Sequence, residues 1–237
     1  MGEQRTAART RFVSFSGVDG AGKSTQIGAL RARLEQDGLR VRVIAFWDSI
    51  ARLTGLREDA GHRVFKGDKG IGSPDAPINR RDKNVQSWPM SCVRLCLYLA
   101  DALSTRIAVA GALRSGVDFV IFDRYIYDEL ANLNLRNPLI RAYARLILHI
   151  VPRPDVSYVL DADPVQARAR KPEYPIEFIH INRKAYMSLA ALVETMTVIA
   201  PGPVEEVKRV VLMHAIAALP AQAAGKPCED IPFQQAG

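Results

Sequence analysis

The segment Gly17-Val18-Asp19-Gly20-Ala21-Gly22-Lys23-Ser24 fits the pattern G-x-x-x-x-G-K-[ST], and it directly follows the apolar, strand-like run 11–16. A strand, a glycine-rich turn and a helix in this order form the phosphate-binding loop (P-loop) of nucleotide-using proteins. The glycines let the backbone curl so that N–H groups face inward, and the following helix directs the positive end of its dipole at the same point. The segment therefore predicts a protein that holds an anionic nucleotide by its phosphates.

The last two residues of the P-loop carry side-chain chemistry. Lys23 is expected to reach the β- and γ-phosphates of ATP as a mobile point charge, and the Ser24 hydroxyl is expected to be a ligand of Mg²⁺. The other candidate ATP-binding residues line the loop and the first helical turn: Gly17, Asp19, Gly20, Ala21, Gly22 and Thr25. A chain of this length meets the pattern by chance roughly once in a hundred. A nucleotide site is therefore preferred over an accidental glycine-rich turn.

The composition is typical of a single-domain enzyme. The chain has 237 residues, of which 48% are hydrophobic and 24% charged, and can bury one α/β core. We expect no apolar run to approach the ~20 residues of a membrane span, and the N-terminus does not lead into a signal-peptide core. The three cysteines lack disulfide or metal-site spacing and are expected to be buried thiols. These patterns favour a cytoplasmic protein with no membrane partner.

The net charge of +7 fits either a nucleic acid or a polyanionic nucleotide as ligand. Basic residues are spread along the chain, and no aromatic platform for stacked bases is present in the sequence. We therefore expect the principal ligand to be a nucleotide and not a nucleic acid.

Strand patterns alternate with helix patterns, which is typical of a parallel sheet covered by helices. Strands are expected near 11–16, 40–46, 117–122, 156–160 and 195–200. Helices are expected near 23–37, 90–114, 138–150, 177–194 and 203–218. The chain is thus predicted to be one P-loop domain over 1–237. Its core at about 11–217 should be a three-layer α/β/α sandwich with a mostly parallel five-stranded sheet.

Three segments depart from the alternation of strands and helices. A polar, basic insert occupies about 61–89, and loops of this length are uncommon unless they are functional or disordered. A basic stretch near 165–177 contains Pro172 and Pro175, which interrupt helix propagation because proline lacks an amide donor. The last segment, about 219–237, is expected to be a poorly ordered tail.

A second chemical motif, Asp123-Arg124-Tyr125, lies at the carboxyl end of the apolar run 117–122. In open α/β sheets, ligands bind beyond this edge, where the P-loop also lies. A carboxylate and a guanidinium at this edge would approach Mg²⁺ and a phosphoryl group. An Asp-Arg pair taken alone is an ordinary ion pair, but beside a P-loop the functional interpretation is favoured.

The P-loop with Thr25, the Asp123-Arg124-Tyr125 motif, and Arg153-Pro154-Asp155 leading to Leu160-Asp161-Ala162-Asp163-Pro164 together resemble the thymidylate kinase family over about 11–217. The resemblance implies a nucleoside monophosphate kinase-like fold with a short lid at about 165–177. It also implies phosphoryl transfer from ATP with Mg²⁺, and a homodimer through the helix near 90–114.

The resemblance also implies roles for single residues. Asp19 would contact the sugar of the acceptor, Asp123 would support magnesium, and Arg124 would contact phosphate. Tyr98 matches the aromatic that stacks on thymine, and Tyr186 fits a recurrent tyrosine behind the lid. Because Gly20 stands where some family members carry an arginine, the closing charge should come from the lid. Arg170 is the first choice for that charge, and Arg168 is the second.

Two departures from the family pattern concern the acceptor. The family arginine that hydrogen-bonds the thymine carbonyl is replaced by Ala102, and the family turn that grips the acceptor phosphate is replaced by Phe46-Trp47-Asp48. Losing a buried hydrogen-bond partner changes discrimination strongly, so poor selectivity for dTMP is expected. Arg80, Arg81 and Lys83 in the basic insert are the candidates to bind the anionic acceptor instead.

Three functions remain open at this point. The leading hypothesis is an ATP-dependent nucleoside monophosphate kinase. The second is a kinase of the same fold that acts on a different small acceptor, which Ala102 and the basic insert favour. The third is a non-catalytic nucleotide-binding or nucleic-acid-associated protein, and the intact Lys23, Ser24, Asp123 and Arg124 count against it.

Overall fold

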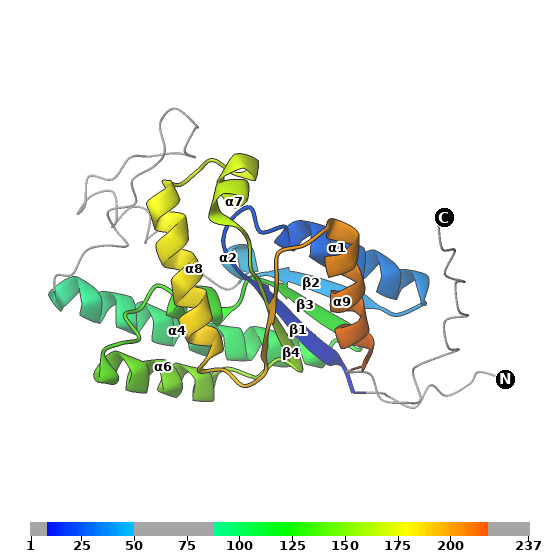
Figure 1. Ribbon diagram of the computed structural model, residues 1–237. Coiled ribbons are helices and arrows are strands. Elements are labelled where there is room, and N and C mark those ends of the chain that lie inside the picture. The colour runs from blue at the N-terminus through cyan, green and yellow to red at the C-terminus, as the bar shows by residue number, and fades with distance from the viewer. Residues whose placement is uncertain (1–8, 50–87, 218–237) are drawn as a thin grey trace.

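The computed structural model describes residues 9–49 and 88–217, and it contains one five-stranded sheet (Figure 1). The strands are β1 (Arg11–Ser16), β2 (Val41–Ala45), β3 (Phe119–Asp123), β4 (Val156–Leu160) and β5 (Met196–Ile199). Their order in the sheet is β2-β3-β1-β4-β5, and each neighbouring pair is parallel. The predicted sheet is confirmed, and it is parallel throughout.

Helices cover both faces of this sheet (Figure 1). They are α1 (Lys23–Gln36), α2 (Phe46–Ser49), α4 (Trp88–Leu113), α5 (Ile126–Leu130), α6 (Pro138–Ile150), α7 (Pro164–Arg170), α8 (Ile176–Ala190) and α9 (Val204–Ala217). One face carries α1 and α9, and the other carries α4, α5, α6 and α8. The predicted three-layer α/β/α sandwich of a P-loop protein is therefore confirmed.

The central strand β1 is covered by helices on both of its faces. Successive side chains of a strand point to opposite faces of the sheet. Val13 and Phe15 belong to the apolar cluster beneath α1 and α9, whereas Phe12 belongs to the cluster beneath α4, α5, α6 and α8. Because both faces of β1 are covered, apolar side chains occur on both faces, and the two serines of the strand, Ser14 and Ser16, are fully buried as well.

Several element boundaries differ from the predicted ones. Phe46 begins the short helix α2 and does not end the second strand, and Asp123 is the last residue of β3. The short helices α2 and α5 had no counterpart among the predicted elements, because four or five residues are too few to show a helical repeat.

The long helix α4 corrects two expectations. Its segment Cys92–Leu113 is long and apolar enough to cross a membrane by length and composition alone, contrary to the expectation of no such run. The core helix of a soluble protein passes the same test, and α4 buries Ala102 and Val109 in the cluster beneath it. Cys96 is exposed and Cys92 half-buried, so these two are not the buried thiols that were predicted.

The outer face of α4, defined by Val93, Leu99, Leu103 and Ile107, is apolar and exposed. Ile107 is 74% exposed and Val93 is 50% exposed. These side chains point away from the core. Helix α4 is therefore apolar on two faces, and more apolar than a helix that buries only one face.

Several predicted features lie outside the described residues. They are the tail at 219–237, most of the insert at 61–89, and the two arginines Arg80 and Arg81 within that insert. Helix α4 begins at Trp88, within the last residues assigned to the insert, and the insert's bounds stay a prediction. The assignment of the whole chain to a single domain stays a prediction.

Candidate active site

The P-loop and the Asp123-Arg124 pair meet at the carboxyl edge of the sheet. In the pairing of β1 with β3, Phe15 lies opposite Asp123, and in the pairing of β1 with β4, Ser16 lies opposite Val159. The loop after β1, the turn after β3 and the segment after β4 therefore emerge side by side (Figure 1). This is the edge at which ligands bind in open α/β sheets.

Two glycines of the P-loop are required by close backbone contacts. Gly17 has φ 136°, and a Cβ there would lie 2.5 Å from the carbonyl oxygen of Leu160. Gly20 has φ 83°, and a Cβ there would lie 2.2 Å from the carbonyl oxygen of Ala167 in α7. Helix α7 thus packs directly on the P-loop, and it occupies the space that a side chain at position 20 would need.

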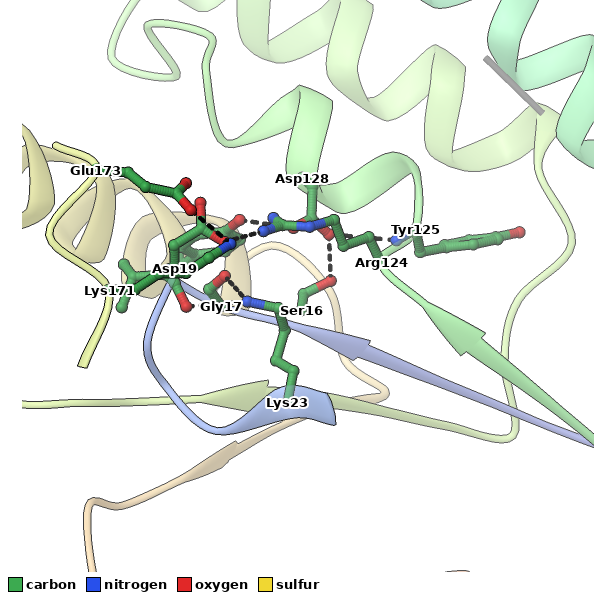
Figure 2. Close-up of polar contacts among 11 residues, drawn as sticks. Ser16, Gly17, Asp19, Lys23, Arg124, Tyr125, Asp128, Lys171 and Glu173 are labelled. Atoms are coloured by element: carbon green, nitrogen blue, oxygen red, sulfur yellow. Dashed lines mark hydrogen bonds and ion pairs between the residues drawn. The ribbon is translucent and has the colours of Figure 1, made fainter. Parts of the chain in front are cut away.

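Lys23 is held inside the P-loop by main-chain oxygens. Its Nζ donates hydrogen bonds to the carbonyls of Gly17 at 2.8 Å and Val18 at 2.9 Å (Figure 2). Burial, and secondly the nearby Arg124 charge, lower the pKa of Lys23 to about 8, against the opposing effect of the carboxylates. By contrast, Ser24 and Thr25 in the first turn of α1 are exposed. An ammonium and two accessible hydroxyls therefore lie at one helix N-terminus.

Arg124 spans the gap between the P-loop and α5. Its φ of 66° is left-handed, and its N–H donates to the carbonyl of Phe15 at 2.9 Å. The guanidinium donates from Nη2 to Asp19 and from Nη1 to Asp128, the latter at 2.9 Å (Figure 2). Burial acts to lower the pKa of Arg124, but the two carboxylates outweigh it and raise that pKa. The side chain is therefore a fixed positive charge beside the P-loop.

The predicted magnesium ligands are the carboxylate of Asp123 and the hydroxyl of Ser24. Burial raises the pKa of Asp123, and the charges of Lys23 and Arg124 oppose that rise. Within 9–49 and 88–217, no group of three or more His, Cys, Asp or Glu side chains could hold a metal ion. One carboxylate and one hydroxyl are nevertheless suitable, because Mg²⁺ is commonly bound by one or two protein oxygens plus phosphates and water.

The predicted lid contacts the P-loop through the end of α7. Arg170 Nη1 donates to the carbonyl of Gly20 at 3.2 Å, while its Nη2 donates to Gln166 at 3.3 Å. Lys171, the residue after α7, lies 3.8 Å from Asp19 and 3.2 Å from Glu173 (Figure 2). Of the two predicted lid arginines, Arg170 is thus the one with a P-loop contact among the described interactions. Sequence reasoning did not single out Lys171.

Asp128 is the residue of the site that sequence reasoning missed. Its carboxylate accepts hydrogen bonds from the Ser16 hydroxyl at 2.7 Å, the Tyr125 N–H at 3.2 Å and the Tyr186 hydroxyl at 2.7 Å. The i,i+4 spacing from Arg124 was the available signal, because residues four apart are neighbours on a helix. The signal was weak, since Arg124 precedes the helix that carries Asp128.

Of the predicted acceptor residues, Asp19 and Arg124 belong to the cluster described above, and Tyr98 lies on α4. Tyr98 is 7% exposed, and Ala102 is fully buried in the core beneath the helix. A fully buried alanine places no polar group where the family pattern has an arginine. Base stacking by Tyr98 stays a prediction, as do the roles of Arg80 and Arg81.

Comparison with known proteins identifies similar kinases over most of the chain. The chain is 31% identical to the thymidylate kinase of Bifidobacterium longum (strain DJO10A) over 192 residues, covering 76% of this chain and 84% of the relative. It is 27% identical to the probable thymidylate kinase of Archaeoglobus fulgidus over 206 residues, covering 83% of this chain and 90% of the relative. A thymidylate kinase of Bradyrhizobium sp. (strain BTAi1) is 60% identical over 38 residues, 16% of this chain.

A family model matches the first part of the chain only. Residues 3–56 match the model of the methylmalonyl Co-A mutase-associated GTPase MeaB. The matched segment contains the P-loop, β1, α1 and β2. The similarity thus covers the phosphate-binding part of the fold and leaves out the Asp123-Arg124 edge and the lid.

Proposed function

The chain belongs to the thymidylate kinase family and is a nucleotide kinase, and we propose that it transfers the γ-phosphoryl group of ATP to a nucleoside monophosphate. The reference reaction is dTMP + ATP to dTDP + ADP. The observation that carries the proposal is the position of the Arg124 guanidinium, held against the P-loop by Asp19 and Asp128. That arrangement puts a fixed positive charge beside a phosphate-binding loop, where charge develops during phosphoryl transfer.

In the proposed reaction, a phosphate oxygen of the acceptor attacks the γ-phosphorus while the bond to the β–γ bridging oxygen breaks, and ADP leaves. Lys23 and the P-loop amides hold the donor phosphates, and Arg124 stabilises the charge between donor and acceptor. Mg²⁺ held by Ser24 and Asp123 would supply further charge neutralisation on the donor phosphates. Positioning and charge stabilisation provide nearly all of the catalysis in this chemistry.

Arg170 is proposed as the lid residue that adds charge at the transferring group. Its guanidinium already donates to the Gly20 carbonyl, and Lys171 lies near Asp19 at the same loop. Because α7 packs on Gly20 without space for a side chain, a positive charge at this point is available from the lid and not from position 20. Closure of such a lid excludes water and completes the charged site.

A different acceptor is the second candidate, and the burial of Ala102 favours it. With position 102 fully buried and apolar, thymine lacks the charged partner that the family pattern provides for its carbonyl. We therefore propose weak selectivity for dTMP among small phosphorylated acceptors.

A homodimer and a cytoplasmic location complete the proposal. The outer face of α4 offers exposed apolar side chains, of which Ile107 at 74%, and Val93 and Leu103 at 50% each, are the most prominent. An exposed apolar patch of this kind commonly marks an interface between proteins.

The test is ADP release from ATP and Mg²⁺ across a panel of nucleoside monophosphates, nucleosides and sugar phosphates. We expect turnover with one or more monophosphates, and loss of that turnover when Mg²⁺ is chelated. ADP release that is independent of every acceptor would contradict the proposed kinase reaction. Strong selectivity for dTMP would instead retain the kinase and refute the altered acceptor.

A further inference from the structure

The buried carboxylate of Asp128 has partners from three separate parts of the chain. Ser16 lies at the end of β1, Arg124 and Tyr125 lie in the turn after β3, and Tyr186 lies on α8. One oxygen, Oδ1, accepts from Arg124 and Tyr186, and the other, Oδ2, accepts from Ser16 and Tyr125. These four donors together occupy the roughly four lone-pair sites that a carboxylate offers.

The two carboxylates that bind Arg124 differ in exposure. The Asp128 side chain is 2% exposed, whereas the Asp19 side chain is 22% exposed and also lies 3.8 Å from Lys171. Asp19 belongs to the P-loop itself, at the surface that meets ligands. It can therefore exchange partners when ligands bind, whereas Asp128 keeps its partners inside the fold.

Arg124 itself needs such a fixed partner. Its backbone is left-handed, a conformation that costs free energy for a residue with a side chain. A long arginine side chain also loses rotamer entropy when it is fixed in one position. Charge-assisted hydrogen bonds are stronger than neutral ones, and the bond to the buried Asp128 helps to offset both costs.

We propose that Asp128 is a positioning residue that orients the Arg124 guanidinium toward the transferring phosphoryl group. In this proposal, the hydrogen bond from Tyr186 fixes the Asp128 carboxylate relative to α8. The inference rests on the proposed kinase function. Helix α8 is attached to the end of β4 by a second contact, in which Arg183 donates two 2.6 Å hydrogen bonds to Asp161. The helix that follows the lid therefore holds Asp128 from a fixed point.

The test compares Asp128→Asn with Asp155→Asn. Asp155 is a matched control because its carboxylate also accepts a main-chain N–H, from Phe12 at 2.8 Å, and pairs with arginines, but at the opposite edge of the sheet. We expect Asp128→Asn to lower kcat roughly 10- to 100-fold with little change in the KM for ATP. Asp155→Asn should retain kcat, and Tyr186→Phe should give a smaller loss than Asp128→Asn.

A double-mutant cycle separates positioning from a general structural role. If Asp128 acts through Arg124, then Asp128→Asn should add little further loss of kcat in an Arg124→Ala background. Losses that multiply in the double variant, or an Asp155→Asn loss equal to that of Asp128→Asn, would overturn the inference.

Side-chain NMR provides a readout that needs no turnover. The Arg124 Nε–H resonance, assigned by its disappearance in Arg124→Lys, should be sharp in the wild type and in Asp155→Asn, and broadened or shifted in Asp128→Asn. An unchanged resonance in Asp128→Asn would overturn the inference. An inactive wild-type protein with these NMR changes would overturn the proposed function alone.

Discussion

The donor edge of the sheet and helix α4 hold their candidate functional residues in different ways. At the donor edge, Lys23 donates to two loop carbonyls, and Arg124 is bound to two carboxylates, one of them buried. On α4, Tyr98 and Ala102 are buried, Ala102 within the apolar cluster beneath the helix, while the outer face of the helix is exposed. The donor site is therefore arranged by polar contacts within the fold, whereas α4 contributes shape and an apolar surface. Substitutions at the donor edge should therefore lower turnover, whereas substitutions on the outer face of α4 should change assembly.

The largest expected effect is at Lys23. Lys23→Ala should lower kcat by roughly a hundred- to a thousandfold, because the ammonium acts on charge that develops between phosphates in a site sheltered from water. ADP release with the best acceptor measures it, and circular dichroism should show an unchanged fold. Lys208→Ala is the control, since Lys208 is paired with Glu205 on the exposed part of α9. If the folded Lys23→Ala variant kept the kcat of the wild type, the assignment of Lys23 to the donor site would be wrong.

The next effect concerns magnesium. Asp123→Asn keeps the shape of the side chain and deletes its charge, so the Mg²⁺ concentration for half-maximal activity should rise roughly tenfold as the electrostatic hold on the ion weakens. A magnesium titration of activity at saturating ATP measures this shift. If the titration curve is superimposable on that of the wild type, Asp123 lies outside the metal shell.

A smaller effect is expected from Gly20→Ala. The new Cβ would lie 2.2 Å from the Ala167 carbonyl, and φ is 83°, so α7 must move away from the P-loop. Stability should fall by about 1–2 kcal/mol from the left-handed backbone alone, and kcat should fall with it. Gly28→Ala in α1 is the matched control, because its Cβ meets open space, and it should stabilise by about 0.5–1 kcal/mol. Urea unfolding and ADP release distinguish the two; equal behaviour would argue against the α7 contact.

On α4, the prediction concerns assembly instead of turnover. Ile107→Asp places a charge at a side chain that is 74% exposed, so the stability of the protomer should change by no more than about 0.5 kcal/mol. If α4 forms the dimer interface, the variant should elute as a monomer in light-scattering chromatography. An unchanged oligomeric state would remove the outer face of α4 from the interface.

The smallest effect is a pH dependence of ATP binding. The pKa of Lys23 is about 8 in the free protein, and bound phosphates favour its charged form. ATP affinity should therefore weaken roughly fourfold between pH 7 and 8.5, as the free lysine loses its proton, because this contribution is lost as the pH rises through about 8. Calorimetric titrations in two buffers of different ionisation enthalpy should show proton uptake near pH 8.5. Lys23→Met should remove the slope, and a slope that persists in this variant would assign it to another group.

Long, strongly patterned elements were predictable from the sequence. The helix expected near 138–150 is found as Pro138–Ile150, where Asn137 caps the first turn and a proline opens it. Strands β1 and β4 were found with the predicted bounds, and β2, β3 and β5 with shifts of one or two residues at their ends. The pattern did not distinguish the core face of α4 from its outer face well enough, so the exposed Cys96 was expected to be buried.

By itself, the sequence determined the P-loop, the parallel sheet and the family, because each depends on a local motif or on a repeat along one element. Only the tertiary structure decided how the site is connected. The bonds of Arg124 to Asp19, of Ser16 to Asp128 and of Arg170 to Gly20 join residues 105, 112 and 150 positions apart. No local pattern specifies such pairs, since they form only when strand ends far apart in the chain meet at one edge of the sheet. The role of Asp128 follows from that meeting of strand ends, and so does the packing of α7 on Gly20.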